Sequence, residues 1–432
     1  MLALLLLALF LPFAQAPTPD SAAQAAARTA IAQAEGPADC VKALQTFVSK
    51  RQQEVRPASG FTSELIKQVD GEKVALAKSC VARFDAAAIK PGLLPGLAEL
   101  YIAAGQPGEG RAIMAKALGA QVTPADRAAA LSTAINVSLS EPKGEERNAR
   151  LEKLIDELDA SAGATLEQKF GAHSRLLGYY RGDDIDAGII KHATWIAGAA
   201  KDFTPEQRKT FGSRFVSSQV DLAEALAGQG MNDEALALLR RTQSEWSDVP
   251  RADAYLAPAI ARYSLVGTAA PPIKAPRWIN APSGTTEMAM DGAVTLLEFT
   301  AHWCGPCRES YPGINRLRQQ YGPKGFRVVM VTRYWGYYSQ DGKMERPLAP
   351  EEELKRDIGY FQGHHLDVPV AVADQARGAS DPNDANYKVS GIPQIHLIDK
   401  QGRIRLIMIG YDEANEPKLA AMIAKLVAEP GR

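Results

Sequence analysis

Two cysteines in the C-terminal third have the spacing that thiol-disulfide chemistry requires. Cys304 and Cys307 are separated by Gly305 and Pro306. An apolar run over residues 294–299 precedes them and predicts a buried strand. The residues that follow predict a helix, which we expect Pro312 to kink. A strand, a Cys-x-x-Cys motif and a helix in this order indicate a thiol-disulfide redox site.

The position of the motif at a predicted helix start explains why its spacing suits this chemistry. The first turn of a helix offers unpaired backbone N–H groups and the positive end of the helix dipole, which lower the pKa of a thiol placed there. We therefore expect Cys304 to be the attacking residue, with an exposed sulfur. Cys307 lies on the same helical face and is positioned to resolve a mixed disulfide. Pro306 suits the first turn because its missing N–H is not needed there.

Two sequence blocks carry a family resemblance. Residues 298–307 read Glu-Phe-Thr-Ala-His-Trp-Cys-Gly-Pro-Cys, and residues 387–404 contain Gly-Ile-Pro before an apolar run. The first block resembles the thioredoxin superfamily, and the second resembles its secreted TlpA/ResA-like branch; together they cover about residues 271–427. The resemblance implies a thioredoxin-like α/β domain in which Pro393 is cis and faces the cysteine pair. It also implies a substrate groove formed by Trp303, Gly305, Pro306, Ile392 and Pro393.

Glu298 lies six residues before Cys304, where thioredoxins carry a buried acid and many TlpA/ResA-like proteins carry asparagine. A buried carboxylate at this place is a candidate catalytic base for Cys307, because burial raises the pKa of a carboxyl group. Glutamate is one methylene longer than the thioredoxin acid. The alternative is a side chain that faces solvent from the strand.

The histidines near the site indicate no metal centre. His302 is next to the motif and is a candidate for stabilising the Cys304 thiolate, but we expect an exposed turn residue. His364 and His365 are neighbours before an apolar strand, and adjacent residues of an extended chain point to opposite faces. We predict neither a metal nor another cofactor. Half of a structural zinc site is a further interpretation of the cysteine pair, but zinc needs two more ligands at suitable spacing.

The N-terminus predicts export. Residues 1–16 are mostly leucine, alanine and phenylalanine and end in Ala-Gln-Ala, the pattern of a cleaved secretory signal, although no Lys or Arg precedes the apolar run. The alternative is an apolar helix packed in a core. The chain has 432 residues and a formal net charge of −1, so nothing in its charge indicates nucleic-acid binding. We expect a periplasmic protein.

Residues 17–264 predict an all-helical domain, because apolar residues recur with helical spacing. Residues 97–118 and 222–239 each have a helix, a glycine turn and a second helix, and this layout resembles a weak tetratricopeptide repeat. A generic helical bundle explains the composition equally well. Helical repeats commonly bind proteins, so we expect a docking role.

Cys40 and Cys80 lie in adjacent predicted helices of this region. In an exported protein such a pair predicts a structural disulfide, which stabilises the chain by roughly 3–4 kcal/mol for a loop of about 40 residues. The alternative is two buried thiols.

The composition changes to Gly, Pro, Ala and Thr over residues 265–291, which predicts a linker and the first strands of the next domain. Residues 292–432 then form the predicted thioredoxin-like domain. A second strand, residues 326–332, runs into an unusually aromatic loop, residues 333–338. This loop is either a lip that recognises a partner, since such residues dominate binding hot spots, or a locally packed insertion.

The sequence therefore predicts an exported thiol-disulfide oxidoreductase that acts on cysteines of other proteins. The Gly-Pro dipeptide and the Gly-Ile-Pro element match those of reducing thioredoxins, which favours reduction and an electron donor in the membrane. The resemblance extends to proteins that serve cytochrome c maturation. Two alternatives stay open: a helical scaffold with an accessory redox domain, and a thiol peroxidase, which has threonine where this chain has Ala301.

Overall fold

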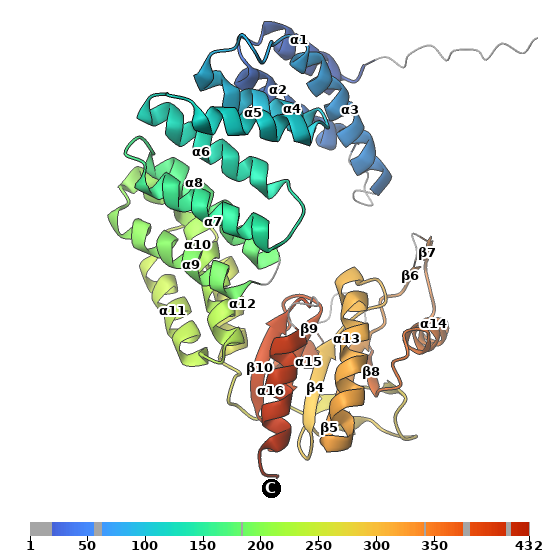
Figure 1. The fold of residues 1–432 in the computed structure, drawn as a ribbon. Helices are drawn as coiled ribbons and strands as arrows, with labels where there is room; N and C mark the ends of the chain where they lie inside the picture. The colour runs from blue at the N-terminus through green and yellow to red at the C-terminus, as the bar shows by residue number, and fades with distance from the viewer. Residues whose placement is uncertain are drawn as a thin grey trace, which may run out of the picture. The chain divides into compact units, whose positions relative to one another are not determined.

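The computed structural model describes residues 20–55, 63–182, 185–340, 343–374, 381–411 and 416–431 (Figure 1). The predicted signal, residues 1–16, lies outside these ranges. The chain divides into two compact units, residues 1–172 and 173–432. None of the helices in the described ranges is both long and apolar enough to cross a membrane.

The first unit is built of helices. In chain order they are α1 (Ala22–Gln33), α2 (Pro37–Val55), α3 (Ser63–Val81), α4 (Leu94–Ala103), α5 (Pro107–Gly119), α6 (Pro124–Leu139) and α7 (Glu145–Ala160). The boundary between the units falls within α8 (Leu166–Gly182). Cys40 in α2 and Cys80 in α3 are bonded through their sulfurs, and both are fully buried.

The pair α4 and α5 shows why the predicted helical hairpins need small residues. Gly105 in the turn has φ of 77°, a conformation that favours glycine. A Cβ on Gly110 would lie 2.6 Å from the Ile102 side chain and 2.8 Å from the Ala98 carbonyl, so the two helices approach too closely for alanine. The helix–turn–helix layout is therefore present, while a tetratricopeptide array stays a prediction.

The second unit begins with α9 (Asp186–Ala199), α10 (Pro205–Gly228), α11 (Asn232–Glu245) and α12 (Ala252–Tyr263). Gly230, with φ of 82°, forms the turn of the second hairpin, between α10 and α11. Strands begin soon after α12, which is where the composition changes in the sequence. The predicted order, a helical region followed by an α/β domain, is confirmed.

A six-stranded mixed sheet forms the centre of the α/β domain, with the order β10-β9-β4-β5-β8-β2. Parallel pairs join β4 to β5 and β5 to β8, and the other neighbours are antiparallel. The strands are β2 (Arg277–Ile279), β4 (Val294–Phe299), β5 (Phe326–Arg333), β8 (Val370–Ala373), β9 (Gln394–Ile398) and β10 (Ile404–Ile409). Two small sheets accompany it, β1 (Ile273–Lys274) with β3 (Glu287–Met288) and β6 (Tyr338–Gln340) with β7 (Lys343–Glu345).

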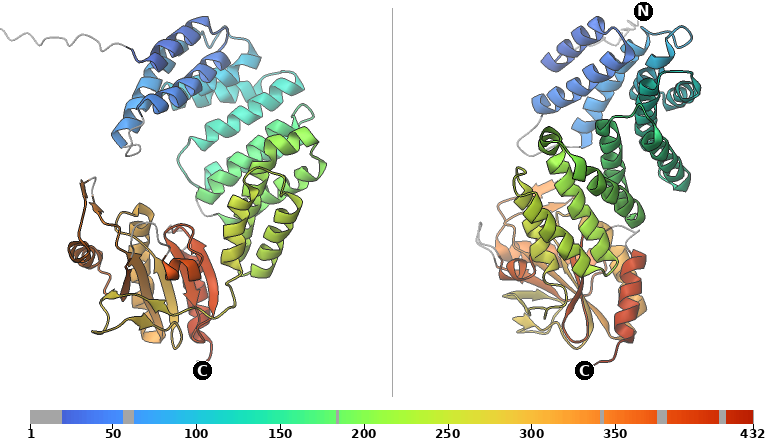
Figure 2. Two further views of the ribbon diagram at one scale, coloured as in Figure 1. Left: turned by 180° about the vertical axis from the view of Figure 1, so that it is seen from behind. Right: turned by 90° about the vertical axis from the view of Figure 1, so that its left-hand side faces the viewer.

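Both faces of this sheet are covered, which is why its central strands are apolar at successive positions. One core contains Val294 and Leu296 of β4 together with α13 (Gly305–Tyr321), α14 (Pro350–Gly363) and α16 (Glu416–Ala428). The other core contains Leu297 and Phe299, covered by the segment that precedes β4 and by residues near α15 (Pro382–Asn386). Figure 2 shows that segment on the side of the sheet away from α13 and α16. Strand alternation thus decides which side chains face the helix that carries the cysteines.

Candidate active site

Cys304 caps the N-terminus of α13 with its own sulfur. Its Sγ accepts a hydrogen bond from the backbone N–H of Cys307 at 3.2 Å, and Pro306 occupies the first turn of the helix. The two cysteines are bonded to each other, with Cα atoms 5.2 Å apart. The helix continues without a break through Pro312.

The expected exposure of the Cys304 sulfur is wrong for this disulfide form. Cys304 is only 3 % exposed, because its sulfur is bonded to Cys307, which lies in the first turn of α13 on the buried face of the helix and is 0 % exposed. Trp303, directly before the pair, is 36 % exposed and is the accessible part of the motif.

Glu298 is buried on the side of β4 that faces α13. It is 0 % exposed, so the alternative of a solvent-facing side chain is excluded. Ser310, one helical turn after Cys307, donates its hydroxyl towards the two carboxylate oxygens at 3.3 and 3.4 Å and to the Cys307 carbonyl at 2.7 Å. Burial raises the pKa of Glu298 to about 8, partly offset by the Ser310 hydroxyl. A carboxyl with this pKa exchanges protons near neutrality.

The loop before β9 is held from several sides. The Ile392–Pro393 peptide bond is cis. The Gln394 side chain accepts the Ser390 N–H at 3.1 Å, and Arg262 of α12 donates to the Ser390 hydroxyl at 2.9 Å. Arg262 is 3 % exposed and also binds Glu224 of α10 at 2.8 Å. The proline loop is therefore anchored both by its own strand and by the helices of the same unit.

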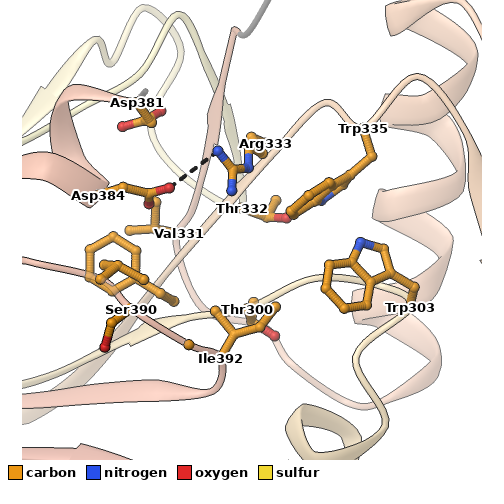
Figure 3. Close-up of a pocket in the computed structure, with 13 residues that line it drawn as sticks. Thr300, Trp303, Val331, Thr332, Arg333, Trp335, Asp381, Asp384, Ser390 and Ile392 are labelled. Carbon is orange, nitrogen blue, oxygen red and sulfur yellow. Dashed lines mark ion pairs between the residues drawn. The ribbon is translucent and has the colours of Figure 1, made fainter. Parts of the chain in front are cut away.

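A cavity of about 240 Å³ opens beside the cysteine motif, at the carboxyl ends of β4 and β5 (Figure 3). Its lining includes Trp303 and Ile392 of the predicted groove; Gly305, Pro306 and Pro393 are not among the lining residues. The remaining residues that line it are Phe299, Thr300, Val331, Thr332, Arg333, Trp335, Asp381, Asp384, Val389, Ser390 and Gly391. This edge of the sheet is where α/β proteins gather their ligands.

The cavity has an aromatic side and a charged side. The Trp303 and Trp335 rings meet edge to face with centroids 5.0 Å apart, and Arg333 stacks over Trp335 at 4.4 Å. Arg333 also pairs at 3.2 Å with Asp384, which lies on the side of the cavity opposite the indoles (Figure 3). Burial raises the pKa of the Asp384 carboxyl. The second acid, Asp381, caps α15 by accepting the Asn383 N–H at 2.6 Å.

The two aspartates are site residues that sequence reasoning missed. The Asp381-Pro382 pair is a helix-start signal, because aspartate is a good N-cap and proline suits the first turn. That signal places a short helix, but it does not reveal that the helix lies against β5. Only the fold brings Asp384 to Arg333.

The expectation of an exposed His302 is also wrong. His302 is 1 % exposed and lies under Tyr338, whose ring stacks on the imidazole with centroids 4.7 Å apart. Its Nδ1 is 3.6 Å from a carboxylate oxygen of Asp357. The aromatic loop, residues 333–338, supplies this cover, so the loop is a packed element as well as part of the cavity wall.

The other predicted histidines lie elsewhere in the domain. His364 caps the end of α14 and contacts the rings of Tyr311 and Tyr360, and burial lowers its pKa. Among the described residues, no group of three or more His, Cys, Asp or Glu side chains is arranged to hold a metal ion.

Comparison with known proteins agrees with this geometry. Residues 265–423 match the redoxin family. The thioredoxin-like protein YneN of Bacillus subtilis is 26 % identical over 119 residues, which are 28 % of this chain and 58 % of that protein. The thiol-disulfide oxidoreductase ResA of Bacillus cereus is 24 % identical over 32 % of this chain and 65 % of its own length. The thiol:disulfide interchange protein HelX of Rhodobacter capsulatus is 25 % identical over 33 % of this chain and 66 % of its own length.

The chain therefore spans less than two thirds of the length of each of these relatives.

A solved structure, a putative thiol:disulfide interchange protein DsbE from Chlorobium tepidum, is 26 % identical to this chain and has a TM-score of 0.28. The match covers 38 % of this chain and 98 % of that one. The thioredoxin-superfamily resemblance that the two sequence blocks carry is confirmed for the C-terminal region, where residues 265–423 match the redoxin family.

Proposed function

We propose that this protein is an exported thiol-disulfide oxidoreductase that reduces disulfides in other proteins, which we call clients. The observation that carries the proposal is the Cys304 sulfur at the N-cap of α13, where it accepts the Cys307 N–H. A thiolate at this position is stabilised by that hydrogen bond and by the helix dipole. The thiolate is the species that attacks a disulfide.

Reduction then proceeds in two exchanges. The Cys304 thiolate attacks one sulfur of the client disulfide, forms a mixed disulfide and releases the first client thiolate. Cys307 loses its proton and attacks the Cys304 sulfur, which releases the second client thiolate and closes the Cys304–Cys307 bond. Two electrons pass from the cysteine pair to the client, and an external donor must restore them.

Glu298 is the candidate base for the second exchange. Ser310, one helical turn after Cys307, donates its hydroxyl both to the Glu298 carboxylate and to the Cys307 carbonyl. The Glu298 pKa of about 8 is close to the about 8.5 of a thiol. A proton therefore moves between the two groups at little cost in free energy, and proton transfer is most effective when the pKa of the base lies near the working pH.

The cavity is the proposed docking place for a client side chain. At about 240 Å³ it is smaller than the roughly 300–1,000 Å³ of typical small-molecule sites, so it suits one large side chain. Trp303 and Trp335 offer aromatic contact area, and the Arg333–Asp384 pair offers polar partners. Ile392, which lines the cavity, and Pro393, which follows it in the chain, are proposed to align the client backbone.

The reducing direction, the periplasmic location and a membrane electron donor rest on the sequence resemblance and on the predicted signal. The equilibrium reduction potential of the Cys304–Cys307 pair tests the direction. Known exchange proteins span about −270 to −120 mV, and about 30 mV corresponds to ~1.4 kcal/mol. A potential near the lower value supports a reductase, whereas one near the upper value indicates a disulfide donor. If the pair does not exchange with glutathione at all, the oxidoreductase proposal fails.

Client capture is the second test. In Cys307→Ala the mixed disulfide cannot be resolved, so Cys304 should retain client proteins in bonds that dithiothreitol releases. Cys304→Ala is the matched control and should retain none. Equal recovery from both variants would contradict the assigned roles.

A further inference from the structure

The cavity beside the cysteine motif has the size of one aromatic side chain. Its volume is about 240 Å³, whereas an apolar cavity of roughly 150 Å³ is enough to hold benzene. A six-membered ring with a substituent therefore fits. One wall consists of the Trp303 and Trp335 rings, whose centroids are 5.0 Å apart and whose planes form an angle of 84°. Because aromatic rings prefer edge-to-face and offset contacts, this wall favours a planar ring over an aliphatic chain.

The polar end of the cavity is a single ion pair. Arg333 and Asp384 are joined at 3.2 Å, and their side chains are 28 % and 25 % exposed, so an occupant can reach both. Figure 3 shows this pair on the other side of the cavity from Ile392. A guanidinium group only donates hydrogen bonds, and a carboxylate only accepts them. A hydroxyl group can do both, so it can bond to the two partners at once while it remains uncharged.

The same ion pair disfavours charged occupants. A carboxylate brought into the cavity would meet the carboxylate of Asp384. An ammonium or guanidinium group would have to displace Arg333, which already pairs with Asp384 and stacks over the Trp335 ring at 4.4 Å. The second acid of the lining, Asp381, is 3 % exposed and caps α15 through the Asn383 N–H, so its charge is used by that helix. A cavity whose charges are already paired does not repay the loss of hydration of a third charge.

We propose that this cavity selects client disulfides in which a tyrosine neighbours the attacked cysteine. The tyrosine ring packs against Trp303 and Trp335. Its hydroxyl accepts a hydrogen bond from Arg333 and donates one to Asp384, so these two residues determine the specificity. The inference rests on the proposed function, whose substrate class it names, and it adds no step to the two exchanges.

Single-turnover exchange tests this selection without an electron donor. The full, reduced protein is mixed with short peptides whose cysteine is joined to 2-mercaptoethanol, and the second-order rate of protein oxidation is measured. The same residue X stands on both sides of the peptide cysteine, so the result does not depend on the direction of the peptide. Each rate is divided by the rate of the same peptide with dithiothreitol, because X also changes the intrinsic reactivity of the disulfide.

Tyrosine at X should give the highest normalised rate. We expect it to exceed phenylalanine about tenfold, which is the effect of the hydroxyl hydrogen bonds. It should exceed alanine, lysine and glutamate about a hundredfold, because these side chains either leave the cavity unfilled or bring an unmatched charge into it.

Two substitutions should change the preference in opposite directions. Asp384→Asn leaves Arg333 as the charge of the cavity, so the glutamate peptide should gain about tenfold while the tyrosine peptide loses about tenfold. Arg333→Gln leaves Asp384, so the lysine peptide should gain instead. A purely structural role of the pair would slow all peptides together. The ion pair Arg356–Glu345, at 2.9 Å and about half exposed, does not line the cavity, so Arg356→Gln is the matched control and should keep the wild-type order.

The outcome is separable from that of the proposed function. Equal normalised rates for tyrosine, phenylalanine and alanine, or a highest rate with lysine or glutamate, would overturn the selection while exchange itself still supports an oxidoreductase. If no peptide and no glutathione exchanges, the proposed function fails.

Binding of p-cresol, which is the tyrosine side chain, examines the cavity without any exchange. The oxidised wild-type protein should bind p-cresol about tenfold more tightly than toluene, as measured by ligand-observed NMR, because only p-cresol carries the hydroxyl. Equal affinities, or no binding of p-cresol, would overturn the assignment of the cavity. Thermal melting of each variant shows whether its fold is intact.

Discussion

The two disulfides of this chain have opposite surroundings although both are buried. Cys304 caps α13 with its sulfur, and its partner is three residues away. Cys40 lies one turn inside α2, and the Asp39 carboxylate before it accepts the N–H groups of Glu35 and Gly36, the two residues that precede the helix, at 3.1 and 3.0 Å. Cys80 is the penultimate residue of α3, at the negative end of that helix. Reduction there would place a thiolate where the helix dipole disfavours it.

The difference teaches that burial does not separate a structural bridge from a redox bridge. When the Cys304–Cys307 bond opens, the Cys304 thiolate is stabilised by the Cys307 N–H and by the positive end of the α13 dipole, so reduction of this disulfide costs little free energy. The bridge between Cys40 and Cys80 instead closes a separation of 40 residues. It therefore restricts the unfolded chain and acts on stability.

Removing each disulfide in turn should produce the largest effects, one on the exchange rate and the other on stability. These two variants therefore test the comparison directly. Cys304→Ala should abolish exchange with glutathione and leave unfolding nearly unchanged. Cys40→Ala with Cys80→Ala should leave exchange intact and cost about 4 kcal/mol of stability in the chain-entropy account. Exchange assays and urea unfolding on the same samples measure both. An exchange-active double variant with unaltered stability would contradict the structural role of the Cys40–Cys80 bridge.

Glu298→Leu should stabilise the protein at neutral pH while slowing the resolving step. The folded pKa is about 8 and the unfolded value is about 4.5, so between these values the folded state binds the extra proton and wild-type stability falls as the pH rises. At pH 7 the variant should gain about 3 kcal/mol, and near pH 4 the gain should vanish. Urea unfolding at several pH values measures it. A gain that is the same at every pH would contradict the raised pKa.

Arg262→Gln should separate protein clients from small disulfides. The change removes the bond to Ser390 and loosens the proline loop, which should lower kcat/KM for a disulfide-containing peptide by about tenfold. The rate with a small aromatic disulfide should stay within about twofold, because it does not use the loop. Arg240→Gln, exposed on α11, is the matched control. Equal losses for both substrates would indicate damage to the cysteine pair instead.

Ser310→Ala should produce the smallest effect. Losing the hydroxyl removes a hydrogen bond to the Glu298 carboxylate, so its pKa should rise further, by an amount worth at most about 1 kcal/mol. Titration of the Glu298 carboxyl carbon by NMR measures the shift. An unchanged pKa would show that the Ser310 hydroxyl donates to the Cys307 carbonyl alone.

Local sequence predicted much of the α/β domain. The apolar run before the motif is β4 with the predicted bounds, 294–299, and the run at 326–332 is β5 with one residue added. Short-range signals succeed here because a central strand covered on both faces must be apolar along its whole length. The cis bond before Pro393 came instead from the family resemblance, since an isolated Ile-Pro pair favours the trans form.

The burial of polar side chains could not be predicted from local sequence patterns. His302 was expected at the surface and is covered by Tyr338, which lies 36 positions later in the chain. Asp384 and Arg333 meet only because α15 lies against the end of β5. No spacing rule links residues so far apart.

The sequence by itself determined the chemistry: a dithiol at a helix start, an acid six residues before it and a proline loop later in the chain. Each of these features is recognisable from one helix or strand and the residues next to it. Only the tertiary structure decided the environment of that chemistry. It buried Glu298 and so moved its pKa, it tied the Ser390 loop to Arg262, and it closed the aromatic loop over His302. Solvation and pairing depend on what long-range packing brings next to a group, and a list of residues does not contain that information.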